Sequence, residues 1–370
     1  MSVLIVLYML WRHYDVTPVL LASTASLLSF RDDAPTCLPV ATHPWNKEVP
    51  KGIPGLLVKQ HNSSKLTNRT EMVNRLLRIM CPKFPDLPEI EVTFPEILLI
   101  VDFNTPEMYH VIPYLELLYR RHFADILYCG AQPETLKQLM ENVSVISSIY
   151  FVDIPHHSWT QKYRCVELAM KMCDKVAGYA LIGDDTLINI KVLRSLPREK
   201  LLFGDNFGRI NTSLKTGWYW WNTDGGRPAM LGMLNELIFR AKQQHDPFSD
   251  SFLRSYYAYI NSSTLIFHMA TDFMYVPKRL TANFLYMVEL FLKYNANVEV
   301  AMPFFVSGLE HPSDVLLVKM HSLWNDDRNN PEKFFHPDDL YLHPFKYGFN
   351  FKKPTGHSFI CDTYLRASIV

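Results

Sequence analysis

Between residues 96 and 183, four short apolar segments alternate with helix-length segments, and this alternation limits the possible folds of the chain. The apolar segments are residues 96–101, 125–128, 148–152 and 179–182. Segments with helical character lie between them at residues 106–121, 133–141 and 157–176. Strands joined by single helices form βαβ units, whose strands are parallel and whose helices cover both faces of the sheet. We therefore expect an α/β fold with a Rossmann-type, mostly parallel sheet.

The composition excludes several classes of protein. Of 370 residues, 48% are hydrophobic and 20% are charged, as in ordinary globular proteins. Wholesale disorder and a multi-span membrane protein are both excluded by this balance. Lys and Arg number 37, and so do Asp and Glu. Without a basic excess to neutralise a phosphate backbone, nucleic acid is not an expected partner.

The N-terminal residues allow three interpretations. Two apolar runs, residues 3–11 and 16–30, are separated by a short polar stretch that includes Arg12 and Asp15. Neither run alone reaches the roughly 20 residues that a spanning helix needs. Residues 1–30 could form a signal anchor, a signal peptide cleaved near the small residues 22–25, or an apolar helix of a cytosolic protein.

Glycosylation sequons and cysteines favour the secretory pathway. Five N-x-S/T sequons begin at Asn62, Asn68, Asn142, Asn211 and Asn261. The six cysteines are compatible with one to three disulfides in an oxidising compartment. A buried thiol is the expected state of Cys173.

The chain divides into four parts. Residues 1–30 are the anchor or signal peptide, and residues 31–95 are a Pro-rich stem with one helix at 71–80. The regular alternation makes residues 96–190 a ligand-binding half, whereas residues 191–370 are a looser second half. In this second half we expect helices at 191–196, 231–244, 247–260 and 280–294, strands at 201–204 and 264–267, and little periodicity after Pro331.

Acidic residues follow three of the four expected strands. They are Asp102, Asp153 and the adjacent pair Asp184 and Asp185. Ligands of open parallel sheets gather at the carboxyl ends of the strands. Two adjacent carboxylates repel unless a cation neutralises them, and oxygen ligands suit Mg²⁺ or Mn²⁺. The alternative is that these residues only cap turns or lie in solvent.

Residues 178–189, GYALIGDDTLIN, resemble the strand and DxD segment of glycosyltransferases with the GT-A fold. The βαβ series before them is similar to the nucleotide-sugar domain of these enzymes. A short N-terminal anchor followed by a Pro-rich stem resembles Golgi type II membrane enzymes. One position departs from the triple-Asp form of the motif, because Gly183 stands where its first carboxylate would be.

The resemblance implies roles for individual residues. Asp185 would coordinate Mn²⁺ or Mg²⁺ on a nucleoside diphosphate, and Asp184 would contact the metal or the ribose. Asp102 and Asp153 would lie around the nucleobase and ribose. A further metal ligand would come from a C-terminal histidine, for which the candidates are His311, His321 and His343. His343 is preferred because Lys346, three residues later, would add a cation for the leaving diphosphate.

The second half would then bind the acceptor. Trp218, Tyr219, Trp220 and Trp221 could stack on the apolar face of a sugar or equally form a packed core segment. A transferase that inverts the sugar needs a carboxylate base, for which the candidates are Asp272, Glu299 and Glu310. Glu299 is favoured because its apolar neighbours would raise its pKa toward that of a useful base.

The sequence as a whole predicts a metal-dependent glycosyltransferase that moves a sugar from a nucleotide-sugar to a glycan or glycoprotein. It would be a single-pass protein of the Golgi or endoplasmic reticulum membrane with a luminal catalytic domain. An alternative, motivated by Gly183, is a catalytically silent GT-A-like protein that binds glycans or scaffolds other transferases. A third possibility is a cytosolic nucleotide-binding enzyme such as a nucleotidyltransferase, although neither a P-loop nor a GxGxxG motif occurs in the chain.

Overall fold

The computed structural model describes residues 56–60, 69–89, 92–141, 143, 145–146, 148–154, 161–213, 216–262, 264–270 and 272–369. The predicted anchor, most of the stem, Cys37 and the sequons at Asn62, Asn68 and Asn142 lie outside these residues. Within the described ranges, no helix combines the length and the apolar character that a bilayer crossing requires.

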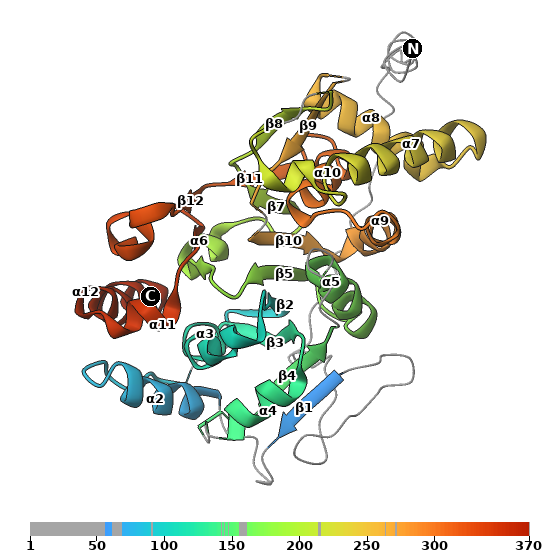
Figure 1. The fold of residues 1–370 in the computed structure, drawn as a ribbon. Helices are drawn as coiled ribbons and strands as arrows, with labels where there is room; N and C mark the ends of the chain where they lie inside the picture. The colour runs from blue at the N-terminus through green and yellow to red at the C-terminus, as the bar shows by residue number, and fades with distance from the viewer. Residues whose placement is uncertain are drawn as a thin grey trace.

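An eight-stranded sheet forms the centre of the described part of the chain (Figure 1). Its strands, in spatial order, are β1 (Leu56–Gln60), β4 (Ser148–Asp153), β3 (Phe123–Gly130), β2 (Phe94–Asp102), β5 (Gly178–Gly183), β10 (Phe273–Pro277), β7 (Leu201–Gly204) and β11 (Val315–Val318). The four predicted strands β4, β3, β2 and β5 are mutually parallel, as the βαβ pattern requires. The expected α/β class is confirmed.

Antiparallel pairing extends the sheet beyond these four strands. Strand β10 runs antiparallel to both β5 and β7, whereas β7 and β11 are parallel. Strand β1 is antiparallel to β4 at the opposite edge. The sequence pattern did not indicate β10, because its five residues are not part of a βαβ unit and owe their conformation to the strands on either side.

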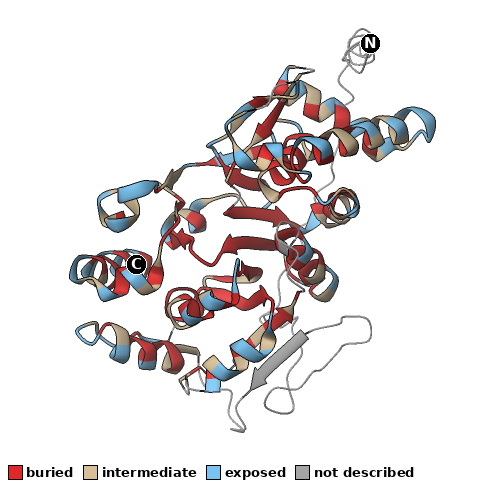
Figure 2. Cartoon of the chain, in the orientation of Figure 1, coloured by how far each residue is buried: buried red, intermediate tan, exposed pale blue. Residues whose placement is uncertain are grey.

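Helices cover both faces of the sheet. Alternate residues of β2 point to opposite sides: Leu98 and Ile100 join one core cluster, and Leu99 and Val101 join the other. The first cluster includes residues of α5 (Gln161–Met172), α7 (Arg227–Gln243), α8 (Pro247–Ile260), α9 (Thr281–Lys293) and α10 (Val298–Leu309). The second includes residues of α2 (Arg69–Met80), α3 (Ile112–Tyr119), α4 (Pro133–Glu141) and α6 (Ile190–Ser195). The central strands are consequently buried on both sides (Figure 2).

The C-terminal part has more regular structure than its sequence pattern indicates. Strands β12 (Met320–Ser322), β13 (Tyr341–His343) and β6 (Leu187–Ile188) form a three-stranded sheet. The chain then forms α11 (Tyr347–Lys352), α12 (Pro354–Ser358), a π-helix at Phe359–Tyr364 and α13 (Leu365–Ile369). Because β13 pairs with β6, which directly follows the Asp pair, the C-terminal part lies beside the predicted site.

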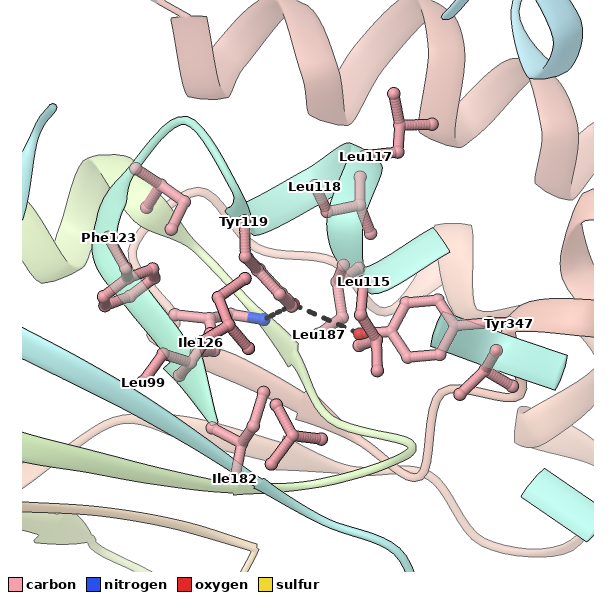
Figure 3. Close-up of a cluster of buried hydrophobic side chains, with 14 of the residues drawn as sticks. Leu99, Leu115, Leu117, Leu118, Tyr119, Phe123, Ile126, Ile182, Leu187 and Tyr347 are labelled. Carbon is pink, nitrogen blue, oxygen red and sulfur yellow. Dashed lines mark hydrogen bonds between the residues drawn. The ribbon is translucent and has the colours of Figure 1, made fainter. Parts of the chain in front are cut away.

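A buried tyrosine cluster helps to hold the C-terminal part in place (Figure 3). Tyr119 accepts a hydrogen bond from the Ile188 amide (2.9 Å), and its hydroxyl lies 3.1 Å from that of Tyr347. The Tyr347 hydroxyl donates to the carbonyl of Thr186 (2.6 Å). Since α3, β6 and α11 share this network, the segment after the Asp pair has little freedom to move.

One local prediction needs correction. The helix expected at 106–121 is a 3₁₀ helix at Pro106–Val111 followed by α3, because Pro113 cannot donate the hydrogen bond of a continuous helix. Thr105 precedes this 3₁₀ helix, but its side chain makes no capping bond. Residues 217–222, which the aromatic run alone leaves open between strand and loop, contain a 3₁₀ helix at Tyr219–Asn222. Strands β8 (Gly208–Asn211) and β9 (Leu265–His268) form a separate two-stranded sheet.

The described cysteines are all bonded. Cys81 is joined to Cys361, which ties α2 to the C-terminal helices, and Cys129 of β3 is joined to Cys165 of α5. The expectation of a free thiol at Cys173 is wrong, since Cys173 is buried but also disulfide-bonded. Burial does not distinguish the two states, because a disulfide is itself apolar enough for a core.

Candidate active site

The predicted aspartates meet at the point where the strand order reverses. From β2 the chain proceeds outward to β3 and β4, and it then returns to place β5 on the other side of β2. Crevices at such a reversal are the usual ligand sites of open α/β sheets. Asp102 ends β2 and lies opposite Gly183, and the Asp184 amide donates to the Asp102 carbonyl (3.0 Å).

Asp184 is buried at this edge and is the carboxyl least disposed to ionise there. Burial, together with the charges of Asp185 and Asp102, raises the pKa of Asp184 to about 8. Its two carboxyl oxygens accept bonds from the backbone and side-chain amides of Asn104 (3.3 and 3.4 Å). At neutral pH the site therefore favours a proton, or a cation in its place, on this carboxyl.

Strand β10 brings Asp272 into the same cluster. The Gly183 amide donates to the Asp272 carbonyl (3.2 Å), so the two residues face each other across the β5–β10 pair. The Asp272 carboxylate contacts the Lys162 ammonium (3.2 Å) and the His343 Nδ1 (2.7 Å). Burial raises the pKa of Asp272, but these two cations outweigh burial and the pKa is lowered. Asp272 is thus ionised although its side chain is buried.

His343 bridges two carboxylates of the cluster. Its Nε2 lies 3.1 Å from Asp185 Oδ1, while its Nδ1 faces Asp272. Burial lowers the pKa of His343, but Asp272 and Asp185 outweigh burial and raise it to about 9. The imidazole is accordingly protonated at neutral pH and forms ion pairs with both carboxylates.

Lys346 completes the set of cations. Its ammonium donates to Asp185 Oδ2, and the Phe345 amide donates to the Asp185 carbonyl (2.5 Å). Burial raises the pKa of Asp185, but His343 and Lys346 hold it well below its usual range. Unlike the buried carboxylate, the Lys346 side chain is 41% exposed, so a ligand can reach it.

Glu299 lies in the first turn of α10, beside the cluster. The Asn297 side chain caps this helix by accepting from the Glu299 amide (2.8 Å), and the Met269 amide donates to the Glu299 carbonyl (3.0 Å). Burial and the charge of Asp272 raise the pKa of Glu299 to about 7, although Lys162 and His343 act in the opposite direction. A carboxylate with this pKa can take a proton at neutral pH.

The structure brings together most of the predicted residues but not all of them. Asp102, Asp184, Asp185, Asp272, His343 and Lys346 form one cluster with Glu299 beside it. Asp153 ends β4 and is separated from β2 by β3. Glu310 lies at the opposite end of α10 from Glu299, in an ion pair with Arg279.

The other two candidate histidines have structural surroundings. His311 is exposed and its Nδ1 lies 2.9 Å from the Ser313 hydroxyl. His321 stacks on Phe334 with their ring centroids 5.1 Å apart. Neither contacts the acidic cluster through any described interaction.

The aromatic segment is divided between the core and the surface. Trp221 is fully buried in the core, and Trp218 packs against His268 at 4.6 Å between ring centroids. Tyr219, by contrast, is 67% exposed and lies edge-on to Trp220. The segment is therefore part core and part exposed aromatic surface.

Two residues of the site were missed by the sequence reasoning. Lys162 is a buried ammonium in the first turn of α5, a helix that follows the carboxyl end of β4. Asn104 comes two residues after Asp102 and contacts Asp184. Both residues come after a parallel strand in the sequence, which could have marked them as candidates. Many other polar residues also come after strands, so this property alone does not select them.

Two of the ligands expected for a divalent cation such as Mn²⁺ or Mg²⁺, Asp185 and His343, lie side by side in the structure. Asp185 Oδ1 and His343 Nε2 lie 3.1 Å apart, as two ligands of one cation can, and Asp184 is close enough to Asp185 to be influenced by its charge. A cation would have to displace the proton from His343 Nε2, because a ligating imidazole is neutral. Asp185, His343 and Asp184 are the residues that would hold it.

Comparison with known proteins finds a similarity over part of the chain. Residues 92–263 match the family model of the STELLO glycosyltransferases. The apo structure of the bifunctional glycosyltransferase WbbM matches with 8% identity and a TM-score of 0.34. The match covers 70% of this chain but only 46% of that protein, so this chain corresponds to less than half of it. No curated protein matches in sequence.

Proposed function

We propose that the chain transfers a sugar from a nucleotide-sugar donor to a glycan or glycoprotein acceptor, because residues 92–263 match the family model of the STELLO glycosyltransferases. The observation that carries the proposal is the buried cluster of aspartates and cations at the reversal of strand order. The family segment includes Asp102, Asp184 and Asp185, which are part of that cluster. The mixed sheet around it is consistent with a GT-A-like fold.

The donor would bind at the carboxyl edge of β2 and β5. Asp102 would accept hydrogen bonds from hydroxyls of the nucleoside, as carboxylates do at equivalent edges of other nucleotide sites. Lys346, which is partly exposed, would contact the diphosphate by exchanging its bond to Asp185 for one to a phosphate oxygen. Asp153, further along the same edge, would contact the base or ribose only if the nucleotide extends across β3.

A divalent cation held by Asp185, His343 and Asp184 would neutralise the diphosphate and make it a better leaving group. Gly183 does not prevent this, because Asp272, which directly precedes β10, lies across from it. A Cβ at position 183 would lie 3.8 Å from Asp272 Oδ1, so the carboxylate of Asp272 already lies near the space that an acidic side chain would enter. We propose that Asp272 orients His343 there.

Glu299 would act as the general base. As the acceptor oxygen bonds to the sugar carbon and the nucleoside diphosphate departs, the carboxylate of Glu299 would take the hydroxyl proton. Its pKa of about 7 suits this role, and its carboxyl is near enough to the site to feel the charges of Asp272 and Lys162. Glu310 is too far along α10 to share the task. Exposed Tyr219 is the part of the aromatic segment that could meet an acceptor sugar.

The compartment we propose is the lumen of the Golgi or endoplasmic reticulum, with residues 1–30 as a single-pass membrane anchor. Support comes from the cysteines, since Cys81, Cys129, Cys165, Cys173 and Cys361 are all disulfide-bonded. Disulfides persist in oxidising compartments and are rare in the cytosol. This makes a cytosolic nucleotidyltransferase the weaker interpretation.

The proposal is tested by the release of nucleoside diphosphate from a panel of nucleotide-sugars, with glycans as acceptors. We expect the full chain to turn over one donor, and Glu299→Gln to lower the rate by roughly 100-fold or more, the usual share of a general base. Glu134→Gln, an exposed change on α4, is the matched control and leaves the rate unchanged. Donor binding without turnover of any donor would instead favour the silent, glycan-binding alternative.

A further inference from the structure

The sequon Asn211-Thr212-Ser213 lies at the end of the small sheet formed by β8 and β9. Asn211 is the last residue of β8 and pairs with Leu265 of β9. The Thr212 amide donates to the Thr264 carbonyl (2.8 Å), which holds the sequon against the start of β9. Ser213 is exposed and Asn211 is half-buried. The motif is thus presented at a strand end with a defined conformation.

The Asn211 side chain is turned toward the third residue of its own sequon. Its Oδ1 accepts from both the amide and the hydroxyl of Ser213 (2.9 and 2.6 Å). Among the described residues, Asn211 Nδ2 donates no hydrogen bond. The carbonyl oxygen is therefore engaged by the hydroxyl that defines the sequon, while the nitrogen that would carry a glycan is left available.

We propose that Asn211 carries an N-linked glycan. This inference shares the luminal compartment proposed above but does not depend on the transferase activity. In the reaction, Asn211 Nδ2 attacks the anomeric carbon of a lipid-diphosphate-linked oligosaccharide supplied by the secretory pathway. The N–C bond forms as the C–O bond to the lipid diphosphate breaks, and the amide proton passes to a base of the transferring enzyme.

A glycan at Asn211 would lie in the part of the molecule that β8, β9 and α8 form. Strands β8 and β9 lie with α8 at one end of the molecule, and α2 and α4 lie at the other (Figure 1). The first residue of β9, Leu265, pairs with Asn211. From the last residue of β9, His268, the chain continues toward Asp272. The glycan would leave the sheet at the end of β9 that is more distant in sequence from Asp272.

The test uses the full chain expressed in cells with a glycosylating secretory pathway. Enzymatic removal of N-glycans in ¹⁸O-labelled water converts each glycosylated Asn to labelled Asp, which peptide mass spectrometry locates. We expect label at Asn211 in the wild type and in Ser213→Thr, which keeps the sequon. Ser213→Ala, which destroys the sequon but leaves Asn211 in place, should carry no label there.

An unlabelled Asn211 in the wild-type chain would overturn the inference, and this readout needs no variant to fold. If peptides with other sequons are labelled and Asn211 is not, the chain reaches the lumen and the assignment of Asn211 is wrong. If no sequon is labelled, the luminal compartment is wrong as well. Activity measured on the same preparation keeps either failure separate from that of the transferase proposal.

Discussion

Two buried clusters of charge in this molecule differ in how their charges are balanced. One lies between α3 and β3, where Glu116 and Arg120 form an ion pair and the Tyr128 hydroxyl donates a hydrogen bond to Glu116. The other is the acidic cluster at the carboxyl ends of β2 and β5. Both are shielded from water, yet only the second contains acids whose pKa values shift in opposite directions. The difference separates charge that stabilises a fold from charge arranged for a ligand.

We call the Glu116 cluster closed because its opposite charges are paired with each other. Arg120 Nε and Nη2 each lie 2.6 Å from a different oxygen of Glu116, and the Tyr128 hydroxyl donates to the same carboxylate (2.7 Å). Burial lowers the pKa of Arg120, but Glu116 outweighs burial and raises it. Glu116 and Arg120 neutralise each other, so the cluster has no unbalanced charge for a ligand to neutralise.

The acidic cluster is not closed in this way. Within it, the pKa of Asp184 is raised to about 8, that of Glu299 is raised to about 7, and that of Asp185 is lowered. Perturbed pKa values of both signs, gathered at a strand edge, are typical of sites where protons or ligands exchange. Burial and the neighbouring carboxylates make Asp184 unfavourable to ionise until another cation arrives.

The largest effect should follow from breaking the closed cluster. Glu116→Gln leaves the Arg120 charge buried without its counter-charge, and we expect unfolding free energy to fall by about 3–5 kcal/mol. Denaturant unfolding measures the change. Glu71→Gln, which breaks an exposed pair with Arg75 on α2, is the control and should cost under about 1 kcal/mol. Equal small effects of both changes would contradict the distinction drawn above.

The next largest effect concerns the ligand. Asp185→Asn keeps the shape of the side chain but removes the charge, so metal-dependent nucleotide binding should weaken by tenfold or more, corresponding to about 1.5–3 kcal/mol for a charged contact. Titration calorimetry gives the affinity. Asp338→Asn, at an exposed position, should leave it unchanged. Wild-type affinity in Asp185→Asn would show that Asp185 does not hold the donor.

The pH dependence of activity tests Glu299. Its carboxylate can accept a proton only when ionised, so kcat/KM should rise with pH through about 7 and level off above it. Between pH 6 and the plateau we expect roughly a tenfold change, one pH unit below a single pKa. In Glu299→Gln the residual rate should lose this rise. If the rise persists in the variant, another group is the base.

The smallest predicted effect is on His343. Asp272 is the main carboxylate that raises the pKa of His343 to about 9, so Asp272→Asn should lower this pKa by about one unit, or 1.4 kcal/mol. NMR titration of the imidazole, without added metal, follows the change. Glu310→Gln, at the far end of α10, is the control and should not alter it. An unaltered His343 in Asp272→Asn would remove Asp272 from its orienting role.

How much the sequence predicted depends on whether a feature is local. Strands β2 to β5 follow from short apolar runs and their helical spacers, and the rule on strand ends brings Asp102, Asp184 and Asp185 to one edge. Strands β10 and β13 are set by pairing with distant strands, so the pattern around them does not reveal their neighbours. The same rule also selected Asp153, which lies outside the cluster. The sequence does not show that β3 separates the ends of β4 and β2.

The cations illustrate the remaining gap. Lys162 reaches Asp272, which is 110 residues away in sequence, and His343 reaches Asp185 from the C-terminal part. His311 and His321 were equally plausible on residue type alone, but the pairing of β13 with β6 selects His343. Tertiary contacts therefore decide which of several similar side chains enters the site.

The most direct test of the account is calorimetric titration of the full chain with a panel of nucleoside diphosphates, each with and without Mn²⁺. The account predicts that one nucleotide binds, that binding requires the metal, and that Asp185→Asn loses this binding while Glu116→Gln retains it at temperatures where that variant is folded. If a folded wild-type chain binds none of them, or if Asp185→Asn binds as the wild type does, the acidic cluster is not a donor site.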